Sequence, residues 1–188
     1  MAIEHTFRTL LGKKVLITGD VGAGKSKLTL TLLMQAINSS FREKITVLDM
    51  APVFTKIKGI KAGGKLKISH EHGKIRYLST PRIETPRLSA KSAYELLYLV
   101  NLNKKRIRPL ISKYLKKPSP ILFVNDISIY LQSGKYKPIQ DILKMAETFI
   151  ANGYYGQTLR SDFGTEVSNI ERRLMKKLAN TVDLVISL

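Results

Sequence analysis

The sequence has no cysteine, and this absence excludes several kinds of site at once. Disulfide bonds, thiol nucleophiles and cysteine-ligated zinc or iron–sulfur centres all require that side chain. Long apolar runs are missing too, since no stretch approaches the roughly 18 residues of a membrane-spanning helix. The N-terminal residues also lack the apolar core of a signal peptide. We therefore expect a cytoplasmic protein without a membrane span.

Acidic residues are few, because 14 Asp and Glu accompany 32 Lys and Arg, for a formal net charge of +18. Such an excess of positive charge attracts phosphate-rich partners such as nucleic acid, nucleotides or anionic membrane faces. A lysine-rich composition typical of a thermophile would produce the same charge without any polyanionic partner. The charge alone leaves both interpretations open.

The 188 residues, 44% of them hydrophobic, are enough for a single domain with its own core over residues 1–188. Apolar runs alternate with segments of helical length, which predicts an α/β fold with a mostly parallel sheet of about five strands flanked by helices. Pro109 is expected to break a long helix. We expect strands at 14–18, 45–48, 121–124, 148–151 and 182–187, and helices at 27–38, 89–116, 139–146 and 166–179.

This alternation stops between about residues 52 and 86. Three glycines there precede two short alternating runs, KLKIS and KIRYLS, which predict a small β-hairpin insertion. His70 and His72 lie between the two runs, and two residues apart on a strand they could bind a metal. A solvated turn is the alternative.

Residues 19–26, GDVGAGKS, fit the pattern G-x-x-x-x-G-K-[ST] and are called the glycine loop below. The loop follows a predicted strand and opens a predicted helix, so its backbone N–H groups should converge on one anion. Lys25 is expected to reach the β- and γ-phosphates of a nucleotide, and Ser26 to bind Mg²⁺. The expected nucleotide-binding residues here are Gly19, Asp20, Val21, Gly22, Ala23, Gly24, Lys25, Ser26 and Lys27.

Two aspartates close apolar runs and are candidates for catalysis. Asp126 follows ILFVN, on a strand that we expect beside the strand of the glycine loop, where it would hold Mg²⁺ through water. Capping of the next helix is the alternative role for Asp126. Asp49 is the competing carboxylate, so one could bind metal while the other orients the attacking group. Lys25, Asp126 and Asp49 are the predicted catalytic residues, and Ser26 and Asp126 the predicted metal ligands.

These motifs resemble those of the P-loop NTPase superfamily, with residues 19–26 as Walker A and ILFVND at 121–126 as Walker B. The resemblance implies a P-loop NTPase fold, Mg²⁺-dependent ATP binding, and hydrolysis or phosphoryl transfer. The segment Asp49-Met50-Ala51-Pro52 looks like the second strand of the signal-recognition, partition and metallochaperone branch, but the extra lysine of that branch is absent. No glutamate follows Asp126, so a fast motor ATPase is not expected.

Asn152 stands where GTPase-related branches place a residue that recognises the base. Gly153 and Tyr154 follow it in place of Lys-x-Asp, so we expect ATP rather than GTP, and Asn152-Gly153 could instead form a turn. Tyr154 and Tyr155 could stack on a base. The candidates for an arginine finger on the γ-phosphate are Arg160, Arg172 and Arg173.

Residues 103–117, NKKRIRPLISKYLKK, predict an amphipathic helix. With Ile107, Leu110, Ile111 and Leu115 toward the core, the basic side chains face outward as a docking face for nucleic acid, or as an ordinary solvated face. Three functions fit: a slow ATPase or switch coupled to a partner, a small-molecule or nucleotide kinase with its acceptor site in residues 52–90, and a nucleotide-binding module that docks on nucleic acid. Each is compatible with a homo-oligomer.

Overall fold

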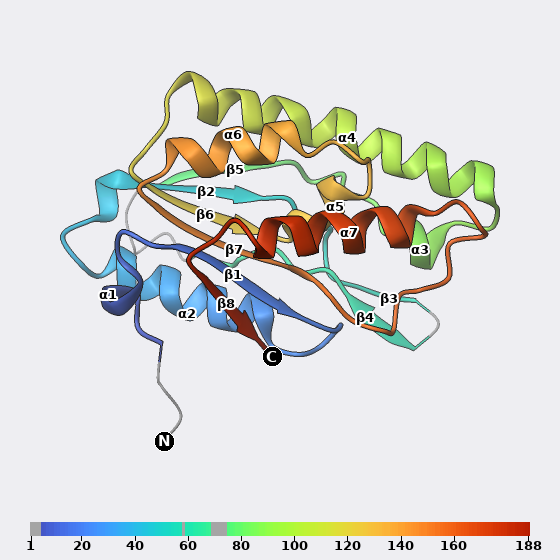
Figure 1. Cartoon of the computed structure of the whole chain (residues 1–188), viewed down its shortest axis with the longest axis horizontal. Coiled ribbons are helices and arrows are strands. Elements are labelled where there is room, and N and C mark those ends of the chain that lie inside the picture. Colours follow the sequence, from blue (N-terminus) through green and yellow to red (C-terminus); the bar gives the residue numbers. More distant parts are fainter. Residues whose placement is uncertain (1–4, 58, 69–74) are drawn as a thin grey trace.

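The computed structural model describes residues 5–57, 59–68 and 75–188 (Figure 1). Its centre is a six-stranded sheet in the order β5-β2-β6-β7-β1-β8, and every neighbouring pair is parallel. Parallel neighbours require crossover connections, which place helices on the faces of the sheet. The strands are β1 (Lys14–Gly19), β2 (Ile45–Asp49), β5 (Arg76–Ser79), β6 (Ile121–Asn125), β7 (Thr148–Tyr154) and β8 (Leu184–Ser187).

Helices cover both faces of the sheet (Figure 1). One face carries α1 (Phe7–Leu10) and α2 (Lys25–Ile37), with the short 3-10 helix η1 (Arg42–Lys44) before β2. The other face carries α3 (Pro86–Ser89), α4 (Ala93–Lys116), α5 (Ile127–Leu131), α6 (Lys137–Met145) and α7 (Val167–Ala179). Because side chains alternate along a strand, Ile121 and Phe123 pack into the core with α2, while Leu122 and Val124 pack into the opposite core. The predicted parallel α/β sheet flanked by helices is confirmed, with six strands in place of about five.

The segment 52–86 contains a β-hairpin, but the two predicted runs do not form it. Arg76–Ser79, from the KIRYLS run, is β5 and pairs in parallel with β2 at the sheet edge, while residues 65–68 of KLKIS form no strand. Tyr77 and Leu78 of β5 pack against opposite cores, which favours the sheet over an isolated hairpin. The antiparallel hairpin is instead β3 (Thr55–Ile57) with β4 (Ile60–Ala62). His70 and His72 lie outside the described residues.

Two further expectations were wrong. Helix α4 continues through Pro109, whose ring lies on the exposed face, so the lost backbone hydrogen bond does not break a helix anchored by Ile107, Leu110 and Ile111. Strand β7 pairs with β1 as far as Tyr154, so Asn152-Gly153 is extended and not a turn. Within the described ranges, every helix is too short or too polar to cross a membrane.

Candidate functional site

The glycine loop joins the carboxyl end of β1 to the first turn of α2. Gly22 and Gly24 have φ of 78° and 92°, a conformation that glycine adopts without steric cost. Gly24 is the N-cap of α2, so the loop places the N-terminal end of that helix at the edge of the sheet. Lys25 Nζ donates to the backbone oxygen of Asp20 at 2.6 Å, across the loop. Burial lowers the pKa of Lys25, and the carboxylates of Asp126 and Asp20 oppose that shift.

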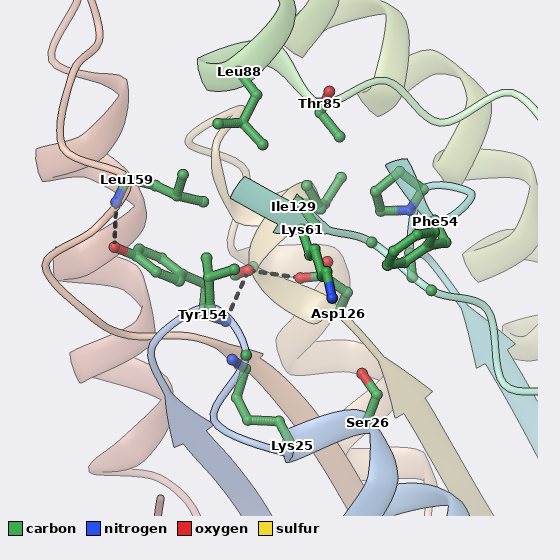
Figure 2. Close-up of a pocket in the computed structure, with 18 of the residues that line it drawn as sticks. Lys25, Ser26, Phe54, Lys61, Thr85, Leu88, Asp126, Ile129, Tyr154 and Leu159 are labelled. Carbon is green, nitrogen blue, oxygen red and sulfur yellow. Dashed lines mark hydrogen bonds between the residues drawn. The ribbon is translucent and has the colours of Figure 1, made fainter. Parts of the chain in front are cut away.

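A cavity of about 310 Å³ opens beside the loop and is called the first cavity. Figure 2 shows Lys25 and Ser26 at one end, Asp126 near the middle, and Thr85 and Leu88 at the far end. The volume falls in the range of small-molecule sites. Other lining residues include Val21, Gly22 and Gly24 of the loop, Lys27 of α2, Phe54 before the hairpin and Lys61 within it, Asn152 and Tyr154 of β7, and Leu159.

Asn125, and not Asp126, is the residue that Ser26 contacts. Ser26 Oγ donates to Asn125 Oδ1 at 3.3 Å, and Asn152 Nδ2 donates to the same oxygen at 2.9 Å. Strand β7 lies between β1 and β6, so the expected adjacency of the Asp126 strand and the glycine-loop strand was wrong. Sequence reasoning missed Asn125, although it is the last residue of the apolar run 121–125.

Asp126 points into the first cavity from a residue in the left-handed region of backbone conformation. Its φ is 57°, a region that is unfavourable for residues other than glycine. The backbone N–H of Asp126 donates to Asn152 Oδ1 at 3.0 Å, and Ser128 Oγ donates to Asp126 Oδ1 at 2.8 Å (Figure 2 draws the second bond). Asp126 is the N-cap of α5 but makes no side-chain cap bond. Burial raises the pKa of Asp126, against the opposing effects of Ser128, Lys25 and Arg87.

Asp49 is fully buried and does not line the first cavity. Its Oδ1 accepts from the Ala51 backbone at 3.1 Å and from Asn125 Nδ2 at 2.9 Å. Its Oδ2 accepts from the Leu66 backbone at 2.8 Å and from the Tyr77 hydroxyl. With both oxygens occupied, Asp49 ties β2, β6 and the segment after the hairpin together. This geometry supports a positioning role and not the predicted contact with the attacking group.

Asp20 uses its carboxylate to hold a second loop. Its Oδ1 accepts from the Val21 backbone at 2.6 Å, and its Oδ2 accepts from the backbone of Gln157 at 2.8 Å and Thr158 at 3.1 Å. Burial alone would raise the pKa of Asp20, but these hydrogen bonds outweigh it and hold the pKa below its ordinary value. Gly156 allows the close approach, since a Cβ there would lie 2.6 Å from Asp20 Oδ2. The sequence pattern did not predict this link.

A buried arginine that sequence reasoning missed also lines the first cavity. Arg87 Nη1 lies 2.5 Å from Glu171 Oε2, with side chains only 5% and 2% exposed, and it donates to the Leu159 backbone oxygen at 2.8 Å. Its guanidinium stacks over the Tyr154 ring at 4.9 Å. The three predicted arginine fingers do not line this cavity: Arg160 and Arg172 line a neighbouring one, and Arg173 lines neither.

The oxygen ligands predicted for a metal, the Ser26 hydroxyl and the Asp126 carboxylate, both line the first cavity, as do the side chains of Thr85, Ser128 and Gln132. No cluster of three or more His, Cys, Asp or Glu side chains occurs among residues 5–57, 59–68 and 75–188. This set fits Mg²⁺, which is usually bound through one or two protein groups together with water and substrate phosphates. It does not fit a metal that needs a cage of protein ligands.

No protein-family model matches the chain, and no curated protein matches it.

Proposed function

We propose that this chain is a Mg²⁺-dependent P-loop NTPase that binds ATP and hydrolyses it slowly, as a switch coupled to a partner. The observation that carries this proposal is the placement of Lys25 and Ser26, on the glycine loop, together with Asp126 in one cavity. The loop supplies backbone N–H donors and a helix N-terminus for a phosphate anion. Lys25 would exchange its bond to the Asp20 carbonyl for the β- and γ-phosphates.

Asp126 is the residue best placed to act on water. Its carboxylate lines the cavity, while Asn125 makes the contact to Ser26. A raised pKa makes a carboxylate a stronger base, and Asp126 would accept the proton of a water as its oxygen bonds to the γ-phosphorus and the bond to the departing ADP breaks. Ser26 and, through water, Asp126 would hold Mg²⁺, which supplies charge neutralisation to the phosphates when bound. A single carboxylate already engaged by Ser128 supports slow turnover.

The partner is proposed to be nucleic acid or another polyanion. Helix α4 buries Ile107, Leu110 and Ile111, as the sequence predicted, and this leaves its basic residues outward. Four of these are exposed, Lys105, Arg108, Lys113 and Lys116, and so is Lys117 at the C-cap. Nucleotide-dependent changes at Asn125 would pass to the rest of the molecule through Asp49 and the Gly64 carbonyl, to which Asn125 Nδ2 donates at 3.0 Å.

The test is binding and turnover of MgATP and MgGTP by the wild type and two variants, with and without nucleic acid. Lys25→Ala should weaken ATP binding by about tenfold or more, because a charge-assisted contact is lost. Asp126→Asn should keep ATP binding but lower turnover by a factor of about 100 or more. Lys44→Ala removes an exposed lysine far from the loop in sequence and is the control. Unchanged ATP binding in Lys25→Ala would refute the proposal.

A second candidate function is a kinase, and the shape of the first cavity favours it. Beyond Asp126 the cavity continues to an apolar end lined by Pro86, Leu88, Ile129 and Leu159 (Figure 2 labels the last three). An acceptor with an apolar body could place a hydroxyl beside Asp126 there. A screen of nucleosides, nucleotides and metabolites for acceptor-dependent ATP consumption separates the two functions, because only a kinase yields a phosphorylated acceptor.

A further inference from the structure

A second cavity, of about 350 Å³, lies on the other side of Arg87. It is lined by the segment 154–162 and by the first two turns of α7, and it shares Arg87, Tyr154 and Leu159 with the first cavity. The remaining lining residues include Arg160, Asp162, Ser168, Asn169, Glu171 and Arg172. Nothing in the proposed nucleotide chemistry uses this space.

The acidic side chains of this lining are already engaged. Asp162 accepts from the backbone of Gly164 at 3.1 Å and of Ser168 at 3.0 Å, at the start of α7. Glu171 pairs with Arg87 and accepts from Gln132 Nε2 at 3.1 Å. Within the part of the chain that the structure describes, neither Arg160 nor Arg172 forms an ion pair. The lining therefore holds three arginines against two acidic side chains, and only Arg87 is paired with one of these.

Two of the three arginines, Arg87 and Arg172, are held in place before any ligand binds. Arg172 Nη1 donates to the Gly156 carbonyl at 3.2 Å, and its guanidinium lies 4.4 Å over the Tyr155 ring. Arg87 is fixed by Glu171 and the Tyr154 ring. A guanidinium has five N–H donors in a rigid plane, so each keeps donors for a ligand. Fixed donors lower the entropic cost of binding.

We propose that the second cavity binds the phosphate group of a phosphate-bearing ligand, separately from the anion at the glycine loop. Guanidinium groups match phosphate oxygens in charge and in fork geometry, and Ser168 and Asn169 add neutral polar groups to the lining. The site adjoins the nucleotide site at two points: Arg87 lines both cavities, and residues 156–158 are held by Asp20 of the glycine loop.

The experiment is a calorimetric titration of inorganic phosphate into the full chain, in which the two sites are removed separately. The wild type should bind at two sites. Lys25→Ala should lose only the site at the glycine loop, whereas Arg160→Ala with Arg172→Ala should lose only the site in the second cavity, with its affinity falling by about tenfold or more. Arg173→Ala removes an exposed arginine on the same helix that does not line the cavity, so its affinity should stay within about twofold.

The two failures are distinguishable. If the Arg160/Arg172 variant binds phosphate like the wild type, the second-cavity inference is overturned while the proposed ATPase stands. If Lys25→Ala loses no site, the proposed function fails and the second cavity is unaffected. Thymidine monophosphate and an oligothymidylate without terminal phosphates then identify the source: binding of only the former indicates a phosphomonoester, and binding of the latter a nucleic-acid backbone.

Discussion

The side chain of Asn125, at the end of β6, contacts Ser26. Its other contacts require an amide at this position and not a carboxylate. Its Nδ2 donates to Asp49 Oδ1 at 2.9 Å and to the Gly64 carbonyl at 3.0 Å. In Asn125→Asp both donations are lost and two buried carboxylates become neighbours. We expect the free energy of unfolding at neutral pH to fall by about 2–4 kcal/mol.

Urea denaturation measures this change, with Asn101→Asp on the exposed face of α4 as the matched control. The control should change the free energy of unfolding by less than about 0.5 kcal/mol. An Asn125→Asp protein as stable as the wild type would mean that Asp49 does not need a neutral partner.

Glu171 makes stability depend on pH. Burial raises its pKa from 4.5 to about 7, although the ion pair with Arg87 acts in the opposite direction. Between these two values the folded state binds a proton that the unfolded state releases, so the free energy of unfolding falls as the pH rises through this window. Above pH 7 this contribution is constant. The expected loss is at most about 3 kcal/mol.

Comparing unfolding of the wild type and Glu171→Gln from pH 5 to pH 8 isolates this contribution. The variant keeps at every pH the neutral side chain that the wild type has only below the pKa of Glu171, so it should lack the downward slope and gain stability relative to the wild type between pH 5 and pH 8. Glu147→Gln, an exposed glutamate, should keep the slope of the wild type. Identical slopes in all three proteins would exclude Glu171 as the titrating group.

At the scale of elements, the helices and strands predicted correctly are those that a local pattern of apolar residues determines. The apolar run of β6 and the periodic residues of α4 indicated their elements, because burial of these side chains follows the period of the backbone. The pairing of β5 with β2 was missed, since an edge strand depends on a neighbour distant in sequence. The same holds for the Arg87–Glu171 pair and the link from Asp20 to Gln157, which no local pattern contains. The glycine loop was located correctly, and its nucleotide remains a prediction.

The link between the glycine loop and the segment after β7 depends on the absence of a side chain at Gly156. In Gly156→Ala the added Cβ would lie 2.6 Å from Asp20 Oδ2, so one of the two loops must move. We expect a loss of about 1–3 kcal/mol in the free energy of unfolding. The Gln157 and Thr158 amides, which donate to Asp20, should exchange with solvent faster.

Gly153→Ala is the matched control, because the nearest atom to its added Cβ is the flexible Cε of Met175, at 2.8 Å. That side chain can move, so the exchange of the Gln157 and Thr158 amides should be unchanged. Hydrogen exchange followed by NMR measures both variants. Unaltered protection of these amides in Gly156→Ala would show that the two loops are not held together by Asp20.

At the scale of the whole molecule, two causes of DNA binding must be distinguished: the net charge of +18 and a specific basic surface on α4. General positive charge attracts any polyanion, whereas a docking face makes particular phosphate contacts. Helix α4 has four exposed basic residues in its second half, and it lies on the face of the sheet opposite α2 (Figure 1). Helix α7 also exposes Arg173, Lys176 and Lys177, which allows a comparison at constant net charge.

We expect the association constant for duplex DNA to fall linearly with salt on logarithmic axes, with a slope of about 0.9 for each phosphate contacted. Replacing Lys105, Arg108 and Lys113 by Gln should lower that slope by up to about 3. The equivalent triple change at Arg173, Lys176 and Lys177 removes the same charge from α7 and should leave the slope close to that of the wild type. Equal effects of the two triple variants would mean that the attraction belongs to the net charge and that α4 is an ordinary solvated face. A lower slope for the α4 variant alone would place the phosphate contacts on that helix, because only direct contacts release counterions from the DNA.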